Sequence, residues 1–146
     1  MVTERLYFAY GSNMSVQQMH ARCPASTMQR PGRLNGYRFR INTRGVATVV
    51  REEGAAVHGI LWTLTDRDEA ALDRYEGVLR GLYEKLMLPI STSSQASALA
   101  LVYIAAGSAP GIPRAGYLES ILEAAQAQGL DQTYVEELRR WLPIAG

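Results

Sequence analysis

Residues 7–14 read Tyr-Phe-Ala-Tyr-Gly-Ser-Asn-Met, an apolar and aromatic run that stops at Gly11 and gives way to small and polar residues. The first half is typical of a buried strand, and a helix-like segment begins at Ser15. A strand that ends in a Gly-Ser-Asn turn before a helix exposes backbone N–H groups, and such a turn can hold a carboxylate or an oxyanion. The same residues also suit an ordinary strand-to-helix turn, with Gly for backbone freedom and Ser or Asn as caps. The stretch alone leaves both interpretations open.

Outward from this stretch, alternating and β-branched runs predict about six strands. Their ranges are Leu6–Tyr10, Tyr37–Ile41, Gly45–Val50, Val57–Leu64, Tyr83–Ile90 and Ala98–Ala105. We expect Glu52-Glu53-Gly54 to form a turn between the third and fourth of these strands. We also expect a loop bracketed by Pro24 and Pro31, and a polar turn at Ser91–Ser97.

Four helices are expected between and after the strands. Their ranges are Ser15–Arg22, Asp66–Tyr75, Leu118–Ala125 and Asp131–Trp141. Ser15 is a candidate N-cap of the first helix, Asp66 and Glu69 resemble a capping box at the start of the second, and Gly129 can terminate the third. Helices mixed with strands in this order predict an α+β (mixed α/β) fold with a mixed sheet, either open or closed into a barrel.

The composition is that of one soluble globular domain, which we expect residues 1–146 to form. Hydrophobic residues make up 47% and charged residues 20%, and the net charge is +1. Arginines are spread along the chain, so no cluster marks a nucleic-acid interface. No apolar run is long enough to span a membrane, and the first residues lack the apolar region of a signal peptide.

Cysteine and histidine usage gives no pattern for a metal site. Cys23 is the only cysteine, and its spacing from His20 is a weak signal that one face of a short helix explains. A single cysteine cannot form an internal disulfide and suits a reducing compartment. We therefore expect a cytoplasmic protein.

A second motif lies in the middle of the chain, where residues 72–83 read Leu-Asp-Arg-Tyr-Glu-Gly-Val-Leu-Arg-Gly-Leu-Tyr. Together with Tyr-Gly-Ser-Asn-Met at residues 10–14, the segments Leu-Asp-x-x-Glu-Gly-Val and Gly-x-Tyr resemble the γ-glutamyl cyclotransferase family, which is AIG2-like. Further matches in the family's order extend the resemblance from about Leu6 to Tyr117. They are Gly32-Arg33-Leu34 and residues 45–49 and 57–62. The resemblance implies a small mixed β-barrel with helices packed around it.

The resemblance also implies a reaction. In this family the α-amine of a γ-glutamyl amide attacks its own γ-carbonyl, 5-oxoproline forms, and an amino acid or amine leaves. The substrate carries the nucleophile, so the family needs no metal and no organic cofactor, and the sequence shows no Ser-His-Asp or Cys-His pattern. We therefore expect a small-molecule γ-glutamyl substrate, no cofactor, and no nucleic-acid or membrane partner. A homodimer is also compatible with the resemblance.

Glu76 is the candidate catalytic residue, first as general base and then as general acid. It lies at the end of an expected helix, directly before Gly77. A partly apolar pocket and a helix C-terminus both raise the pKa of a carboxyl group. A solvated helix glutamate is the plain alternative, and the match of Glu-Gly-Val to the family motif favours the catalytic role.

Substrate binding is assigned by the same resemblance to the turn residues Tyr10, Gly11, Ser12, Asn13 and Met14. Their N–H groups can bind the glutamyl carboxylate or the oxyanion that develops on the γ-carbonyl. Matching tyrosines of the family imply that three phenols line the pocket, although each also suits core packing. These are Tyr83, Tyr103 and Tyr117.

Four arginines lie in and beside the strand region before Gly45: Arg33, Arg38, Arg40 and Arg44. One of them could bind a carboxylate. A solvated strand face is the favoured interpretation of all four.

Other functions on the same scaffold stay open. The leaving group can be a plain amine, as in a γ-glutamylamine cyclotransferase, or part of a biosynthetic intermediate from which a γ-glutamyl protecting group is removed. A non-enzymatic small-molecule binding module is a third alternative, which the retention of Glu76 disfavours. Glutathione is less expected, because glutathione-degrading relatives differ in the residues after Tyr-Gly-Ser.

Overall fold

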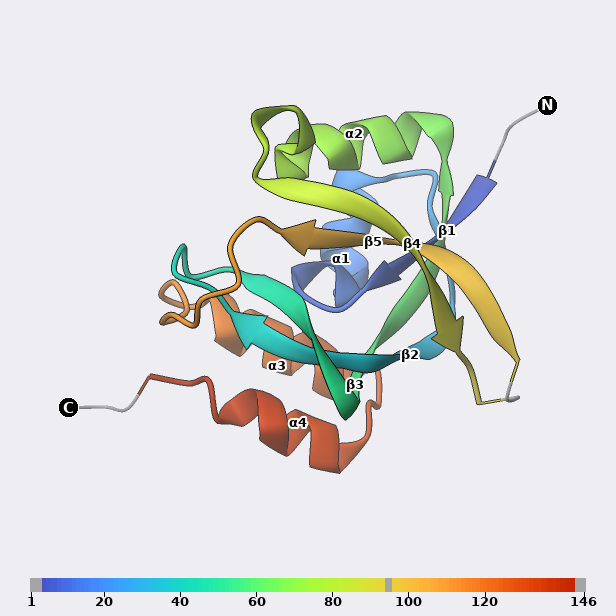
Figure 1. Cartoon of the computed structure of the whole chain (residues 1–146). Helices are drawn as coiled ribbons and strands as arrows, with labels where there is room; N and C mark the ends of the chain where they lie inside the picture. Colours follow the sequence, from blue (N-terminus) through green and yellow to red (C-terminus); the bar gives the residue numbers. More distant parts are fainter. Residues whose placement is uncertain (1–3, 94–95, 144–146) are drawn as a thin grey trace.

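Five strands form a closed barrel in this computed structural model, which describes residues 4–93 and 96–143 (Figure 1). They are β1 (Glu4–Ala9), β2 (Thr27–Ile41), β3 (Ala47–Thr65), β4 (Tyr83–Ser91) and β5 (Ser97–Ala105). Around the barrel they follow the order β1-β3-β2-β4-β5. Neighbouring strands are antiparallel except β1 and β5, which are parallel. The α+β fold with a small barrel is therefore confirmed.

Two of the six expected strands are one strand, because β3 continues through the turn expected at residues 52–54. The pairing of β3 with β2 shifts register between Asn35 and Tyr37, where extra residues of β3 bulge out of the ladder. Gly36 and Gly54 have φ angles of 81° and 84°, which glycine adopts without a steric cost. Gly54 therefore marks an irregularity within one long strand, and the prediction of a turn between two strands was wrong.

The loop expected between Pro24 and Pro31 is also shorter than predicted, because β2 begins at Thr27 and includes Pro31. A register shift lies between Met28 and Arg30. The shift does not include Pro31, which lies opposite Ile60 in the regular part of the ladder.

The helices are α1 (Val16–Arg22), α2 (Asp66–Glu76), α3 (Tyr117–Ala127) and α4 (Gln132–Arg139), with 3₁₀ turns η1 (Ser12–Met14) and η2 (Val78–Arg80). In Figure 1, α2 covers one side of the barrel, and α3 and α4 cover the opposite side. No helix in the described ranges is long and apolar enough to cross a membrane.

Side-chain caps begin three of these helices, and that of α4 is Asp131, whose carboxylate accepts a 2.9 Å hydrogen bond from the N–H of Thr133. The Ser15 hydroxyl accepts a hydrogen bond of 3.3 Å from the N–H of Gln18, so the expected cap of α1 is confirmed. The cap of α2 is Thr65, one residue before the expected Asp66. Its hydroxyl accepts a 3.1 Å hydrogen bond from the N–H of Asp68.

Apolar side chains fill the barrel and the inner faces of the helices. Phe8 of β1, Ile60 of β3 and Leu101 of β5 are buried. The expected apolar stripe of α3 is buried as well, and it consists of Leu118, Ile121, Leu122 and Ala125. Because α3 also contacts η1, this packing holds the turn after β1 against the barrel.

Gly59 allows β1 and β3 to approach each other closely. A Cβ atom at this position would lie 2.3 Å from the carbonyl oxygen of Ala9 and 2.8 Å from the Phe8 ring. We predict that Gly59→Ala lowers the free energy of unfolding by about 2–3 kcal/mol, because the backbone of β1 must shift. Urea unfolding measures the change. Gly11→Ala is the control, since its new Cβ would make ordinary contacts of 3.7 Å, and equal losses in both variants would contradict the close approach.

Candidate active site

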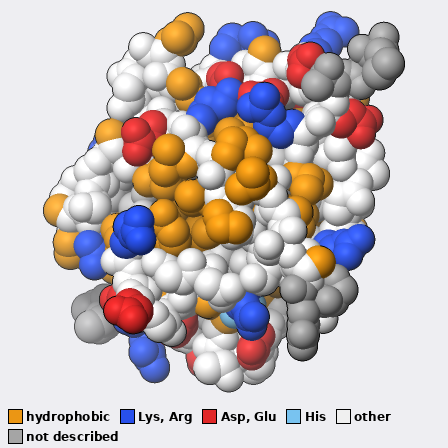
Figure 2. Space-filling model, turned by 45° about the vertical axis from the view of Figure 1, so that its right-hand side comes forward, with side chains coloured by type: hydrophobic (Ala, Val, Ile, Leu, Met, Phe, Trp, Pro, Cys, Tyr) orange, Lys and Arg blue, Asp and Glu red, His pale blue; other side chains and the backbone are white. Residues whose placement is uncertain are grey.

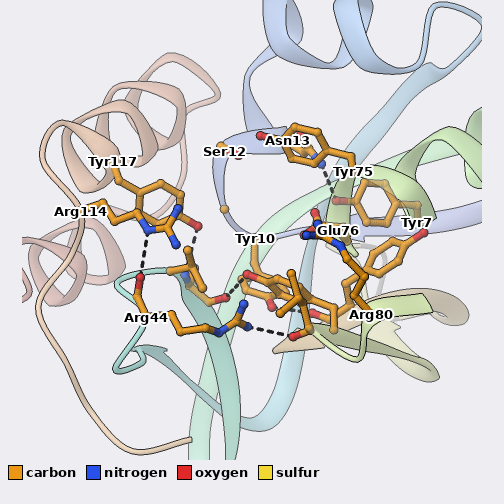
Figure 3. Close-up of a pocket in the computed structure, with 16 residues that line it drawn as sticks. Tyr7, Tyr10, Ser12, Asn13, Arg44, Tyr75, Glu76, Arg80, Arg114 and Tyr117 are labelled. Atoms are coloured by element: carbon orange, nitrogen blue, oxygen red, sulfur yellow. Dashed lines mark hydrogen bonds between the residues drawn. The ribbon is translucent and has the colours of Figure 1, made fainter. Parts of the chain in front are cut away.

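One cavity of about 320 Å³ brings the two sequence motifs together (Figure 3). Most of the residues expected at the site line it: Tyr10, Gly11, Ser12, Asn13, Glu76, Tyr83, Tyr103 and Tyr117. Met14 does not line it, because its side chain is fully buried in the core. The wall also contains residues that the sequence did not point to, among them Tyr7, Tyr75, Arg80 and Arg114.

The turn after β1 presents backbone donors to the cavity. Within the turn, the N–H of Met14 donates to the carbonyl of Gly11 and the N–H of Ser15 donates to that of Ser12, both at 3.1 Å. In residues 4–93 and 96–143, no group accepts a hydrogen bond from the N–H of Gly11, Ser12 or Asn13. Three N–H groups are therefore available to an anionic ligand.

Arg22, the last residue of α1, holds this turn in place. Its guanidinium donates to the Ser12 hydroxyl at 3.2 Å and to the side-chain oxygen of Asn13. It also donates to the Tyr75 hydroxyl on α2. The Asn13 amide in turn donates to the Tyr7 hydroxyl at 3.0 Å. No sequence pattern pointed to Arg22, whose role depends on the packing of α1 against α2.

Glu76 ends α2 inside the cavity. Gly77 follows in the left-handed conformation, with φ of 69°, and stops the helix at this point. The carboxyl group is half-buried, and the described part of the chain offers it no hydrogen bond or ion pair. Burial raises the pKa of Glu76 to about 7, against a smaller opposing effect of the nearby Arg22 charge. At neutral pH the group can therefore both accept and donate a proton.

Polar contacts fix α2 to the barrel. Lys85 of β4 lies 2.5 Å from a carboxylate oxygen of Glu69 and 3.0 Å from one of Asp73. The Tyr103 hydroxyl donates to Asp73 at 2.6 Å. The backbone carbonyl of Tyr103 accepts a 2.5 Å hydrogen bond from the Tyr10 hydroxyl. Tyr103 thus connects the helix that carries Glu76 with the residue that precedes the turn.

Two other tyrosines brace the opposite wall through the backbone of Ala47. The N–H of Ala47 donates to the Tyr117 hydroxyl at 3.0 Å, and the Tyr83 hydroxyl donates to the Ala47 carbonyl at 3.1 Å. Burial raises the pKa of both phenols, so both are neutral at physiological pH. They form a neutral, hydrogen-bonded wall.

Arg44 departs from its expected place on a solvated strand face. It lies in the loop between β2 and β3, is half-buried and lines the cavity. Arg33 is exposed, whereas Arg38 and Arg40 are partly exposed, and Arg38 pairs with Glu52 at 2.9 Å. The alternation of the strand ends before Arg44, which is why the strand pattern misplaced it.

No group of three or more His, Cys, Asp or Glu side chains in the described ranges is arranged to hold a metal ion. The cavity offers one carboxyl group, the turn residues Gly11, Ser12 and Asn13, and several phenols and guanidiniums.

Comparisons with known proteins show what the chain is similar to. Residues 56–138 match the AIG2-like family. The chain is 28% identical over 144 residues to a γ-glutamylcyclotransferase of Mus musculus, and the match covers 92% of this chain and 77% of the mouse protein. It is 26% identical over 144 residues to a γ-glutamylcyclotransferase of Homo sapiens, with the same coverage. The solved structure of a γ-glutamyl cyclotransferase superposes with a TM-score of 0.90 at 25% identity, covering 99% of this chain and 91% of that one.

The burial of Glu76 predicts a measurable effect on stability. Its pKa of about 7 in the folded chain lies above the ordinary value of 4.5, so the folded state binds more protons between these values and loses stability as the pH rises through them. We predict that Glu76→Gln stabilises the protein by about 1–3 kcal/mol more at pH 8 than at pH 4. Urea unfolding at both pH values measures this.

The control for this measurement is Glu53→Gln. Glu53 is exposed and has no hydrogen bond or ion pair with the described residues. Its substitution is expected to change stability equally at the two pH values. The same flat result for Glu76→Gln would contradict the raised pKa.

Proposed function

Because the chain belongs to the AIG2-like family, as its two motifs predicted, we propose that it is a γ-glutamylcyclotransferase. It converts γ-glutamyl amino acids or related γ-glutamyl amides into 5-oxoproline and a released amino acid or amine. The observation that carries this proposal concerns one cavity. It contains a carboxyl group with a pKa of about 7 and a turn with three N–H donors, none of which has a hydrogen-bond partner among the described residues.

The reaction moves protons between two nitrogen atoms of the substrate. The α-ammonium group loses a proton, and the amine nitrogen attacks the γ-carbonyl carbon to close a five-membered ring. The bond from that carbon to the leaving nitrogen then breaks. Overall, two protons leave the α-nitrogen and two reach the leaving nitrogen, which departs as an ammonium ion.

Glu76 is the proposed carrier of these protons. Its ionised carboxylate accepts a proton from the α-ammonium group, and its protonated form then donates one to the leaving nitrogen. A pKa of about 7 suits both steps, since neither form is rare at neutral pH. The ion pairs of Lys85 with Glu69 and Asp73 hold α2, and with it Glu76, in a fixed position.

The turn is the proposed cradle for the substrate's oxygen atoms. The N–H groups of Gly11, Ser12 and Asn13 can hold the glutamyl carboxylate or the oxyanion that forms at the γ-carbonyl. Arg22 fixes the turn, so the donors need little rearrangement when the substrate binds. Holding the amine and the carbonyl in a near-attack geometry contributes on the order of 7 kcal/mol or more.

The alternatives differ in how well the cavity supports them. A purely binding module has no need of Glu76, which is half-buried without a hydrogen bond or ion pair to the described residues. A γ-glutamylamine cyclotransferase and an enzyme that removes a γ-glutamyl protecting group use the same chemistry. They differ only in the group that leaves.

Several expectations stay predictions, namely the cytoplasmic location, the single domain, the absence of nucleic-acid and membrane partners, and the homodimer. Figure 2 shows hydrophobic side chains gathered on one face of the molecule, with basic side chains next to them. A surface of this kind suits contact with another protein.

Gly11 tests the role of the turn. Its φ of −120° is not in the left-handed region that favours glycine, and its ψ is −136°. A Cβ would contact Ala47 and the Tyr117 hydroxyl at 3.7 Å and would occupy space in the cavity. We predict that Gly11→Val changes the free energy of unfolding by less than about 1 kcal/mol and raises KM at least about tenfold. An unchanged KM would show that the turn is only structural.

The mechanism is tested with γ-glutamyl-alanine and its N-acetylated form, with products identified by mass spectrometry. A cyclotransferase releases 5-oxoproline from the first compound and leaves the second intact, because acetylation removes the nucleophile. Glu76→Gln is expected to lower turnover on the order of 100-fold or more while the substrate still binds. Release of alanine from the acetylated compound at a comparable rate would instead indicate hydrolysis by water.

A further inference from the structure

Guanidinium groups outnumber carboxylates in the wall of the cavity. Arg44, Arg80 and Arg114 line it, whereas Glu76 is its one acidic side chain in the described chain. None of the three arginines belongs to an ion pair with a described residue. Elsewhere in the protein, Arg38 pairs with Glu52 at 2.9 Å and Arg5 with Glu69 at 3.3 Å. The cavity therefore holds positive charge that the carboxylates of the described residues do not pair with.

Two of these arginines form a fixed pair. The Nε of Arg114 donates to the backbone carbonyl of Arg44 at 2.9 Å, and an Nη of Arg44 donates to the carbonyl of Leu82 at 2.9 Å. The Arg44 guanidinium also lies 5.7 Å from the centroid of the Tyr83 ring. A guanidinium has five N–H donors, so each of these side chains is held by one and keeps the others for a ligand.

The pair lies away from Glu76. In Figure 3, Arg44 and Arg114 are beside Tyr117, on the side of the cavity opposite Tyr7 and Tyr75. Arg80 belongs to the end that contains Glu76, since its guanidinium would lie 3.1 Å from a Cβ built on Gly77. The positive charge is thus divided between the end with the carboxyl group and the opposite end.

We propose that Arg44 and Arg114 bind the α-carboxylate of the leaving amino acid. This assignment rests on the proposed function, in which the α-nitrogen of the glutamyl group lies at Glu76. The leaving group then extends away from Glu76, toward the arginine pair. Two guanidiniums at the same end of the cavity, each with unused donors, match the charge of a carboxylate.

The charge of the substrate supports this choice over a plain amine. A γ-glutamyl amino acid carries two carboxylates and one ammonium group, whereas a γ-glutamylamine carries one carboxylate and one ammonium group. The second carboxylate is the one that the Arg44–Arg114 pair can neutralise. A leaving amine without it would leave both guanidiniums without an anionic partner, so the cavity is specific for amino-acid leaving groups.

Three substrates of similar size isolate the carboxylate. They are γ-glutamyl-alanine, γ-glutamyl-alaninamide, in which the charge is removed, and γ-glutamyl-ethylamine, in which the whole group is absent. All three give 5-oxoproline, so one assay compares them. We expect kcat/KM to be at least about tenfold higher for γ-glutamyl-alanine than for the other two, the effect of losing a hydrogen bond to a charged group.

Arg114→Met then tests the assignment to this pair. It is expected to raise KM for γ-glutamyl-alanine about tenfold and to leave KM for γ-glutamyl-ethylamine unchanged, which removes the preference. Arg114→Lys keeps the charge and is expected to retain part of it. Arg140→Met is the control, because Arg140 is exposed just after α4 and does not line this cavity.

Equilibrium binding separates this proposal from the proposed function. Calorimetry with the Glu76→Gln protein measures the preference for γ-glutamyl-alanine over γ-glutamyl-alaninamide without turnover. A preference that Arg114→Met abolishes supports the carboxylate site, even if no substrate yields 5-oxoproline and the cyclotransferase activity is disproved. Equal affinities for the two compounds, or an equal loss for all three substrates in Arg114→Met, would overturn it and indicate that Arg114 only braces the loops.

Discussion

The position of Glu76 depends on the ion pairs that fix α2 to the barrel. Lys85 of β4 lies between Glu69 and Asp73 of this helix, and Tyr103 of β5 donates to Asp73 as well. These groups are partly shielded from water, and together they form a network. Such a network is worth more than an isolated surface ion pair, which contributes about 0–1 kcal/mol. Because α2 ends at Glu76, the same contacts determine where the carboxyl group lies in the cavity.

Arg22 connects α2 with the turn after β1 through its hydrogen bonds. It hydrogen-bonds Ser12 and Asn13 of the turn and Tyr75 beside Glu76, so the two motifs, far apart in the sequence, are held by one side chain. The arrangement has a cost, since burial of the carboxyl group destabilises its charged form. A reactive group kept partly desolvated, without a structural partner, is typical of a site shaped by function rather than by stability.

The sequence predicted those features that local pattern determines. The strand before Gly11 and the cap at Ser15 follow from composition, and the motif around Glu76 identified the end of α2. The predictions were wrong where contacts between segments distant in the sequence determine the structure. A glycine at position 54 reads as a turn, yet β2 pairs with β3 on both sides of it. Likewise, Arg114 follows no periodic pattern, because its place in the cavity depends on how the segment before α3 packs against the loop after β2.

Arg44 and Arg114 lie at one end of the cavity and Glu76 lies at the other. This separation allows the cavity to contain several cations and also a carboxyl group that accepts protons. An arginine in contact with Glu76 would favour the ionised carboxylate, lower its pKa and weaken it as a proton acceptor. The charge that does oppose the raised pKa belongs to Arg22, whose donors are engaged with the turn and with Tyr75. Arg44 and Arg114 lie across the cavity, where they can attract an anion without forming an ion pair with Glu76. The raised pKa of Glu76 therefore depends on how far the arginine pair lies from it, as well as on the burial of the carboxyl group.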